Sequence, residues 1–184
     1  MGLNAQPSGE RVHIGFFGLR NAGKSSVVNR VTGQTLSIVS DVKGTTTDPV
    51  QKAMELLPIG PVVIIDTPGI DDEGTLGAER VRRALRVLEK TDIAVLVTDS
   101  TRGLQSAEQE LIELFRKREI PFVIAHNKAD LTSVPAVMPE NEIYVSAAAD
   151  SDIRELKELI ARAVKPTEPE KRLVADLLAP NDTA

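Results

Sequence analysis

The segment from Gly18 to Ser25 constrains the fold of this chain more than any other part of its sequence. It reads Gly-Leu-Arg-Asn-Ala-Gly-Lys-Ser, which is the pattern G-x-x-x-x-G-K-S. An apolar run, Val12–Phe17, precedes it, and apolar residues at helical spacing follow between residues 27 and 31. The segment therefore lies between a predicted strand and a predicted helix, where glycines let successive backbone N–H groups converge on phosphate oxygens. The sequence predicts a phosphate-binding loop at this point.

The residue types within this loop suit particular parts of a nucleotide. Lys24 supplies a positive charge for the β- and γ-phosphates, and the hydroxyl of Ser25 is a ligand for Mg²⁺. The other residues of the candidate binding loop are Asn21, Ala22, Gly23 and Ser26. The alternative is a glycine-rich turn that has these letters by chance, which we expect in roughly one chain in a hundred or fewer.

Apolar runs recur along the chain, and most are followed by a polar or glycine-rich break and then by a segment with helical spacing. That alternation is typical of a parallel sheet covered by helices. The runs are rich in Val, Ile and Phe, as strands that are buried on both faces should be. They are Val12–Phe17, Val62–Ile65, Ile93–Val97, Phe122–Ala125 and Ile143–Val145. We therefore expect five parallel strands.

A sixth strand is predicted at Val50–Leu57. It is separated from Val62–Ile65 by Pro58-Ile59-Gly60-Pro61, a break that is too short for a crossover connection. The two strands should therefore form an antiparallel hairpin at one edge of the sheet. The predicted fold class is α/β, with a mixed, mostly parallel sheet of six strands and helices on both faces.

Four helices are predicted from apolar residues at i, i+3 and i+4. Their stripes are Val27, Val28 and Val31; Leu76, Val81, Ala84, Leu85 and Leu88; Leu111, Ile112, Leu114 and Phe115; and Ile153, Leu156, Leu159, Ile160 and Ala163. A further short helix is expected at Glu170–Leu178. The 184 residues suffice for one domain. We place it at residues 11–166, after a flexible N-terminus (1–10) and before a linker or the start of another domain (167–184).

A second motif, Asp66-Thr67-Pro68-Gly69, begins where the strand at Val62–Ile65 ends. An aspartate at that place can hold Mg²⁺, and Gly69 lets a backbone N–H approach the γ-phosphate closely. The pattern D-x-x-G alone is common in turns. Its place after a phosphate-binding loop makes it specific.

A third motif, Asn127-Lys128-Ala129-Asp130, follows the strand at Phe122–Ala125. The carboxylate of Asp130 can accept hydrogen bonds from N1–H and the 2-amino group of guanine, whereas adenine has neither donor, so the motif favours GTP over ATP. Asn127 would tie this loop to the phosphate-binding loop, and the stem of Lys128 would cover one face of the base. The alternative is a polar turn. Small residues after the last strand would let a backbone N–H reach the guanine carbonyl: Ser146, Ala147 and Ala148.

The composition excludes several other kinds of site and partner. The chain has no Cys, which rules out disulfides, zinc–thiolate sites and iron–sulfur clusters on it. Its net charge of −5 disfavours nucleic acid binding over the whole surface. No apolar run approaches the ~20 residues that cross a bilayer, and Met1–Glu10 is not signal-like. We expect a cytoplasmic protein with neither a membrane nor a nucleic acid partner.

Taken in order, the motifs resemble a G domain of the TRAFAC class of GTPases over about Arg11–Val164. This resemblance implies a Ras-like fold, GTP and GDP as ligands, and hydrolysis of GTP to GDP and phosphate. It assigns Mg²⁺ to Ser25, Thr46 and Asp66. The asparagine at position 21, together with the stretches 38–41 and 44–46, resembles the TrmE–Era–EngA group, in which such an asparagine helps to bind K⁺.

The residue after D-x-x-G is Ile70, where Ras-like proteins carry a catalytic glutamine. A hydrophobic side chain cannot orient water, so hydrolysis should be slow, on the order of 10⁻⁴ to 10⁻² s⁻¹. We expect K⁺, held by Asn21 and by loop carbonyls, to supply charge where an arginine finger would. Catalysis would then depend on Lys24, Thr46 and Asn21. Glu73 is a candidate for positioning the water, and the alternative for it is a solvated acidic turn.

The narrowest resemblance is carried by Gly44–Val50, Pro58–Val62 and Asp71–Gly74, with Thr47 where the wider group usually has arginine. These stretches resemble the GTPase domain of the HydF family, the maturation GTPases of FeFe-hydrogenase. Chains of that family add a dimerisation domain and an iron–sulfur domain. The resemblance implies nucleotide-dependent self-association and contact with other hydrogenase maturation proteins, but no iron–sulfur cluster on this chain.

Two alternatives stay open. One is a related G domain that serves ribosome assembly or tRNA modification, in which GTP gates RNA binding. The other is a scaffold that binds GTP without turnover. We expect the loops 33–49 and 69–75 to depend on γ-phosphate and Mg²⁺ for their order, and a metal site is not expected at His13 or His126, which lack ligand spacing.

Overall fold

Six strands form one sheet in the part of the chain that the computed structural model describes, residues 11–33, 50–67 and 77–164. Their order is β2-β3-β1-β4-β5-β6. β2 pairs antiparallel with β3, and all other neighbours are parallel. The predicted mixed sheet with a hairpin at one edge is confirmed. The strands are β1 (Val12–Gly18), β2 (Val50–Leu56), β3 (Gly60–Asp66), β4 (Ile93–Asp99), β5 (Phe122–Asn127) and β6 (Glu142–Tyr144).

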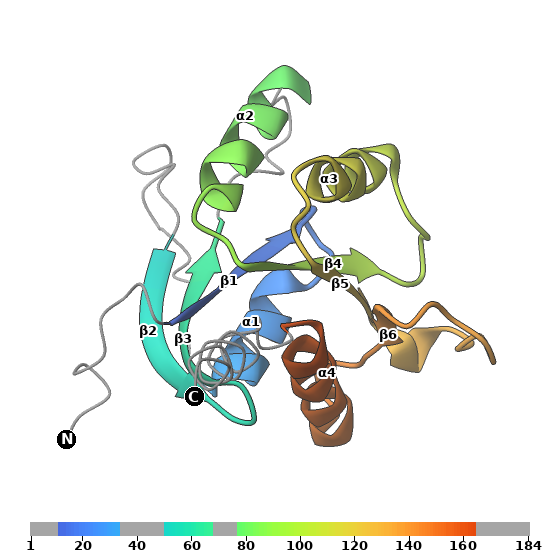
Figure 1. Cartoon of the computed structure of the whole chain (residues 1–184). Helices are drawn as coiled ribbons and strands as arrows, with labels where there is room; N and C mark the ends of the chain where they lie inside the picture. Colours follow the sequence, from blue (N-terminus) through green and yellow to red (C-terminus); the bar gives the residue numbers. More distant parts are fainter. Residues whose placement is uncertain (1–10, 34–49, 68–76, 165–184) are drawn as a thin grey trace, which may run out of the picture.

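Helices cover both faces of this sheet, as predicted. α1 and α4 lie on one face, and α2 and α3 lie on the other (Figure 1). A short 3-10 turn, η3, follows β5 and has no counterpart in the sequence prediction. The helical elements are α1 (Lys24–Thr32), α2 (Gly77–Leu88), α3 (Ser106–Lys117), α4 (Asp150–Ala163) and η3 (Ala129–Leu131).

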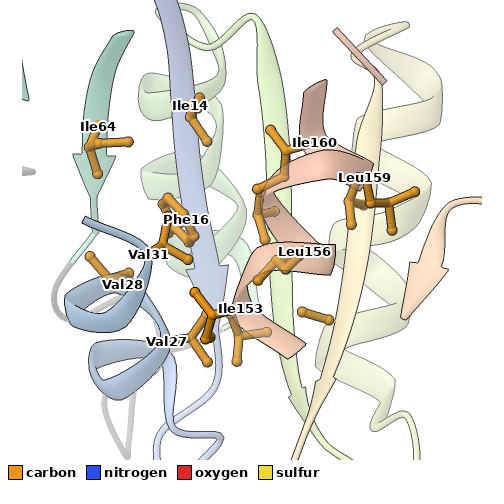
Figure 2. Packing of buried hydrophobic residues seen from close by; sticks show 14 of the residues in the cluster. Ile14, Phe16, Val27, Val28, Val31, Ile64, Ile153, Leu156, Leu159 and Ile160 are labelled. Atoms are coloured by element: carbon orange, nitrogen blue, oxygen red, sulfur yellow. The ribbon is translucent and has the colours of Figure 1, made fainter. Parts of the chain in front are cut away.

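The first core cluster lies between the sheet and the pair α1 and α4 (Figure 2). Phe16 of β1 points into it and is fully buried. The predicted stripes of α1 and α4 face it, because apolar residues at i, i+3 and i+4 share one side of a helix. Its members on these two helices include Val27, Val28, Val31, Ile153, Leu156, Leu159 and Ile160.

The second core cluster lies on the opposite face, under α2 and α3. Phe17 belongs to it, because successive side chains of a strand point to opposite faces. Its ring centroid lies 5.1 Å from that of Phe115, which in turn lies 5.6 Å from that of Phe122. Each buried aromatic side chain of this kind contributes about 1.5–3 kcal/mol through burial.

Several strands extend further than the apolar runs from which they were predicted. β1, β3, β4 and β5 include one or two polar or small residues at their carboxyl ends, namely Gly18, Asp66, Thr98 with Asp99, and His126 with Asn127. β6 lies one residue earlier than expected, at Glu142–Tyr144, although Val145 is fully buried beyond its end. Apolar residues report burial, whereas backbone pairing in the sheet is what bounds a strand. The functional residues therefore begin inside the sheet.

The strand order places the phosphate-binding loop at the centre of the sheet. β1 has β3 on one side and β4 on the other, so the chain changes direction across the sheet after β3. Ligands of open α/β sheets bind at such a switch point, outside the carboxyl ends of the strands. The loop between β1 and α1 lies at this point (Figure 1).

Some predictions concern residues outside the described part of the chain. These are the flexible N-terminus, the helix at Glu170–Leu178, the linker at 167–184, the two loops expected to depend on γ-phosphate, and the site residues Thr46, Gly69 and Glu73. Among the helices that are described, none combines the length and apolar character that a bilayer span requires.

Candidate functional site

The phosphate-binding loop connects the end of β1 at Gly18 to the start of α1 at Lys24. Two of its residues have left-handed backbone conformations, Asn21 with φ of 69° and Gly23 with φ of 85°. The N–H of Ala22 donates to the carbonyl of Leu19 at 3.1 Å, which closes the turn. A backbone that alternates in this way aims several N–H groups toward one concave side, where an anion binds.

The start of α1 keeps its positive end available. Gly23 is the N-cap residue, and within the described residues no side chain caps the helix and no acidic residue lies in its first turn. Unpaired N–H groups and the helix dipole both favour an anion here. Ser25 and Ser26 of the first turn are exposed, so their hydroxyls are available to a ligand.

Lys24 lies between α1 and the end of β3. Its Nζ donates to the carbonyl of Thr67 at 2.7 Å and lies 2.9 Å from Oδ1 of Asp66. Both charged side chains are nearly buried, with 10% of Lys24 and 7% of Asp66 exposed. The structure thus brings the predicted phosphate-binding lysine and the predicted Mg²⁺ aspartate together.

Asp66 and Ser25 have the donor chemistry of a magnesium site. Apart from the ion pair with Lys24, Oδ1 of Asp66 accepts no hydrogen bond among the described residues, although it is buried. A buried carboxylate oxygen and a hydroxyl are the hard oxygen ligands that Mg²⁺ prefers. The described residues contain no cluster of three or more His, Asp or Glu that suggests a different metal site.

Thr67 has a role that the sequence did not reveal. Its hydroxyl donates to the carbonyl of Phe16 at 2.9 Å, and its side chain is buried. This bond holds the segment after β3 against β1, while its own carbonyl receives Lys24. A threonine after a strand-end aspartate is the only signal in the sequence, and it is too ordinary to have been singled out.

Asn127 joins three segments at the end of β5. Its Nδ2 donates to the carbonyl of Ala22 at 3.0 Å, and its Oδ1 accepts from the N–H of Ala147 at 3.3 Å. The side chain is almost fully buried. The link to the phosphate-binding loop is the one that the sequence suggested, and the link to the loop after β6 is additional. Residues 127–132, called the base-recognition loop below because they carry the candidate guanine motif, are therefore linked to the phosphate-binding loop and to the loop after β6.

Lys128 bridges two further elements. Its backbone is left-handed, with φ of 64°, and its Nζ donates to the carbonyl of Asn21 at 2.8 Å. The same Nζ donates to Oδ2 of Asp99 at 2.8 Å. Asp130 lies in η3 and is exposed, so its carboxylate can meet a base from solvent.

The loop after β6 lies beside this motif. The N–H of Ala129 donates to the carbonyl of Val145 at 3.0 Å. The N–H of Ser146 donates to Asp152 at 2.8 Å, which anchors the loop on the first turn of α4. The structure therefore brings the predicted residues 146–148 next to the predicted residues 127–130.

Asp99, the last residue of β4, does more than support the turn that follows it. Its Oδ1 accepts from the N–H and the hydroxyl of Thr101, and its Oδ2 accepts from Lys128. Burial would raise the pKa of Asp99, but the hydrogen bonds from Lys128 and Thr101 outweigh it, so the pKa lies below its usual value. The contact with Lys128 joins the end of β4 to the loop after β5. These segments are distant in sequence, so the spacing of residues did not predict the contact.

The two histidines have protein partners. His126 lies 2.9 Å from the hydroxyl of Thr98 through Nδ1 and 2.8 Å from Glu142 through Nε2, and it stacks on Tyr144 with centroids 4.6 Å apart. His13 contacts Asp92 through its ring nitrogen at 3.3 Å. His126 thus lies near the carboxyl end of β5, whereas His13 lies near the amino end of β1.

Comparisons with known proteins find a matching family and similar chains. The protein family described as "50S ribosome-binding GTPase" matches residues 13–128. The tRNA modification GTPase MnmE of Legionella pneumophila (strain Paris) is 34% identical over 155 residues, which cover 82% of this chain and 34% of MnmE. GTPase Der of Maridesulfovibrio salexigens is 41% identical over 125 residues, which cover 65% of this chain and 27% of Der.

Solved structures show the same fold. A crystal structure of Era in complex with MgGDPNP and nucleotides 1506–1542 of 16S ribosomal RNA matches with a TM-score of 0.65 and 25% identity, over 86% of this chain and 58% of the Era chain. The chain spans only about a third of the length of the curated relatives that it matches.

Proposed function

Because this chain belongs to the 50S ribosome-binding GTPase family, we propose that it is the switch domain of a slow, K⁺-stimulated GTPase. The family binds and hydrolyses GTP, so GTP is the substrate and GDP and phosphate are the products. The observation that carries the proposal is the double link of Asn127 to Ala22 and Ala147. It holds the phosphate end and the base end of the site in one rigid unit.

The binding site is divided between the two ends of the nucleotide. Backbone N–H groups from residues 21–26 and the ammonium of Lys24 bind the phosphates. Asp130 accepts two hydrogen bonds from guanine, and the stem of Lys128 covers the face of the base. Residues 146–148 offer a backbone N–H to the guanine carbonyl. Ser25, Thr46 and Asp66 would hold Mg²⁺, which would neutralise developing charge on the phosphates, and Gly69 is the residue whose N–H would approach the γ-phosphate.

Slow hydrolysis follows from Ile70, which occupies the place of a water-orienting glutamine. Asn21 is the residue that would bind K⁺, and it lies within the phosphate-binding loop with a left-handed backbone. K⁺ bound there supplies positive charge near the phosphates, as an arginine finger does. Glu73 is the proposed residue for orienting the water.

Turnover in KCl against equimolar NaCl, with Mg²⁺ and saturating GTP, tests the cation. We expect faster turnover in KCl and loss of that difference in Asn21→Ala. Equal rates in the two salts would remove K⁺ from the proposal without affecting GTP binding. Glu73→Gln tests the water-positioning residue, because it should lower the single-turnover rate while leaving GDP affinity unchanged.

For the cellular role we propose FeFe-hydrogenase maturation, on the resemblance carried by residues 44–50, 58–62 and 71–74. In this role the nucleotide state would control self-association and contact with other maturation proteins. Sedimentation of the domain with GDP and with a non-hydrolysable GTP analogue tests self-association. A single monomeric species in both states would contradict it.

A second candidate role is RNA-linked, and the comparisons favour it. MnmE is a tRNA modification GTPase, and Era was solved with ribosomal RNA. The expectation that this chain has no nucleic acid partner is therefore not supported by its relatives. Filter binding with tRNA and ribosomal RNA fragments at moderate salt separates the two roles, because retention of RNA that depends on GTP would favour the RNA-linked role.

Calorimetry tests the proposal that both roles share. Titration of GDP with Mg²⁺ into the folded domain should give a saturable heat at one site, and ATP should give none. A scaffold that binds GTP without turnover would show the heat but release no phosphate in a single-turnover assay. Absence of heat with GDP would contradict the proposed function itself.

A further inference from the structure

Asp99 contacts the candidate base-recognition lysine directly, yet the proposed chemistry gives it no role. It is the last residue of β4, and its side chain is only 12% exposed. Its Oδ1 accepts from the N–H of Thr101 at 2.9 Å and from the hydroxyl of Thr101 at 2.5 Å. These two bonds fix the carboxylate plane. The other oxygen, Oδ2, is then aimed at Nζ of Lys128, 2.8 Å away.

Lys128 would be a poorly defined element of the site without this carboxylate. A lysine side chain has four rotatable bonds, and its compact ammonium has no preferred plane of approach. Here Nζ has two acceptors on different elements, the carboxylate of Asp99 and the backbone carbonyl of Asn21. These two acceptors hold the ammonium in place, and only Asp99 is charged.

The charge of Asp99 is suited to this task. The hydrogen bonds from Lys128 and Thr101 hold its pKa below the usual value despite burial, so the group is a carboxylate at neutral pH. A bond between two ionised groups is shorter and stronger than a neutral one. The side chain of Lys128 is one third exposed, so water competes for its ammonium unless a charged acceptor retains it.

A second set of hydrogen bonds also joins the segment after β4 to the base-recognition loop. The N–H of Ser100 donates to the carbonyl of Asn127 at 3.0 Å, and the hydroxyl of Thr132 lies 3.1 Å from that of Ser100. The segment after β4 is thus bonded to both ends of the base-recognition loop. Asp99 directly precedes Ser100, so it is adjacent to this second set of contacts.

From this geometry, and resting on the proposed function, we propose that Asp99 is a positioning residue for guanine nucleotide binding. It holds Lys128 extended, so that the stem of Lys128 covers the base while its ammonium stays on the carbonyl of Asn21 in the phosphate-binding loop. Loss of the carboxylate releases both contacts together. The nucleotide should then dissociate faster, because the base-recognition loop and the phosphate-binding loop lose the hydrogen bond from Lys128 to Asn21 that joins them.

A double-mutant cycle on GDP dissociation tests this role. Asp99→Asn keeps the shape and removes the charge, and Lys128→Met keeps the stem and removes the ammonium. With a fluorescent GDP analogue and excess unlabelled GDP, each single variant should dissociate about tenfold faster than wild type, as expected for loss of one charge-assisted hydrogen bond. If Asp99 acts through Lys128, the double variant should dissociate no faster than Lys128→Met alone.

Asp92→Asn is the matched control. Asp92 also accepts a hydrogen bond, from the backbone N–H of His13, but it lies just before the start of β4, at the other end of the strand from Asp99. Its substitution should leave the dissociation rate within twofold of wild type. Asp99→Glu keeps the charge and shifts it by one methylene, so it should restore most of the slow dissociation and serves as the informative variant if Asp99→Asn does not fold.

Unfolding of the nucleotide-free variants separates positioning from general stability. A merely structural Asp99 predicts a lower melting temperature, with additive effects of the two substitutions on the dissociation rate. Additive effects, or a wild-type rate in Asp99→Asn, would overturn the proposal while leaving GTP binding intact. Failure of wild type to bind GDP would instead overturn the proposed function, and this inference with it.

Discussion

A Cβ atom added to Gly23 would lie 2.2 Å from Nδ2 of Asn127. The base-recognition loop therefore approaches the phosphate-binding loop so closely that only glycine fits between them. The φ of 85° at Gly23 disfavours a side chain for a second, independent reason, because this left-handed backbone strains a residue that carries a Cβ. This contact explains physically why the last glycine of the motif cannot be replaced.

The first prediction concerns this contact. Gly23→Ala should lower GDP affinity by more than tenfold, because the added methyl displaces Asn127 and both loops with it. Gly33→Ala is the matched control at the other end of α1, where φ is 67° but nothing lies within 4 Å of the added atom. It should cost about 1–2 kcal/mol of unfolding free energy from backbone strain alone. GDP titration and urea unfolding of both variants measure the contrast, and equal affinities would contradict it.

The second prediction concerns the amide of Asn127. Asn127→Ala leaves the carbonyl of Ala22 and the N–H of Ala147 without their buried partner, which costs about 1–3 kcal/mol of unfolding free energy. GDP affinity should fall as well, because the two loops separate. Asn141→Ala is the control, because it removes another hydrogen bond from a side-chain amide to a backbone carbonyl, that of Phe122. The control should therefore lower stability alone, and a loss of GDP affinity in it would argue against a local effect.

The third prediction concerns the choice of base. Asp130→Asn replaces an acceptor with a group that donates, so it should weaken GTP and favour xanthosine triphosphate, whose carbonyl replaces the 2-amino group. Competition between the two nucleotides for the wild type and the variant measures the change in preference. Because Asp130 is exposed, its substitution should leave stability within about 0.5 kcal/mol. An unchanged preference would show that Asp130 does not recognise the guanine base.

The fourth prediction concerns the core beneath the site. Leu156 of α4 is fully buried in the first cluster, so Leu156→Ala should lower the unfolding free energy by about 2–5 kcal/mol. Leu57, at the turn between β2 and β3, is 71% exposed. Leu57→Ala should therefore change stability by no more than about 0.5 kcal/mol. Urea unfolding of the two variants tests the assignment of α4 to the core.

The fifth prediction concerns pH. Burial raises the pKa of Glu108 above its ordinary value of 4.5, against the hydrogen bond that it accepts from the N–H of Gln105. A raised carboxyl pKa in the folded state favours folding at low pH, and that contribution is lost as pH rises through the folded value. The unfolding free energy of wild type relative to Glu108→Gln should therefore decrease between pH 4 and neutral pH. Parallel curves for the two proteins would contradict this.

The elements of the fold followed from the sequence because apolar periodicity is a local signal. The stripe from Ile153 to Ala163 identified α4, and the short break at Pro58–Pro61 identified the hairpin of β2 and β3. The sequence did not predict the order of the strands. Which strands become neighbours depends on contacts across the whole chain, and an apolar run does not indicate the strand with which it pairs.

The same division applies to the site. The residues of the three motifs were found because their spacing is local. The structure brings Lys24, Asp66 and Asn127 together at the carboxyl ends of the parallel strands. The contacts of Asp99 and Thr67 were not predicted. Each residue bonds to a segment that is distant in sequence, Asp99 to Lys128 and Thr67 to Phe16. Polar residues that work by tertiary pairing leave no pattern in the sequence.

The position of β1 between β3 and β4 determines how the protein would distinguish substrate from product. Three strand spacings, about 14 Å at ~4.8 Å each, separate β3, which ends at Asp66, from β5, which ends at Asn127. In the proposed binding mode, GTP and GDP share the half of the ligand that contacts the loop after β5, and they differ only at the half near the end of β3. This binding mode confines the discrimination of GTP from GDP to the hairpin side of the sheet, while the side at β5 makes the same contacts with both nucleotides.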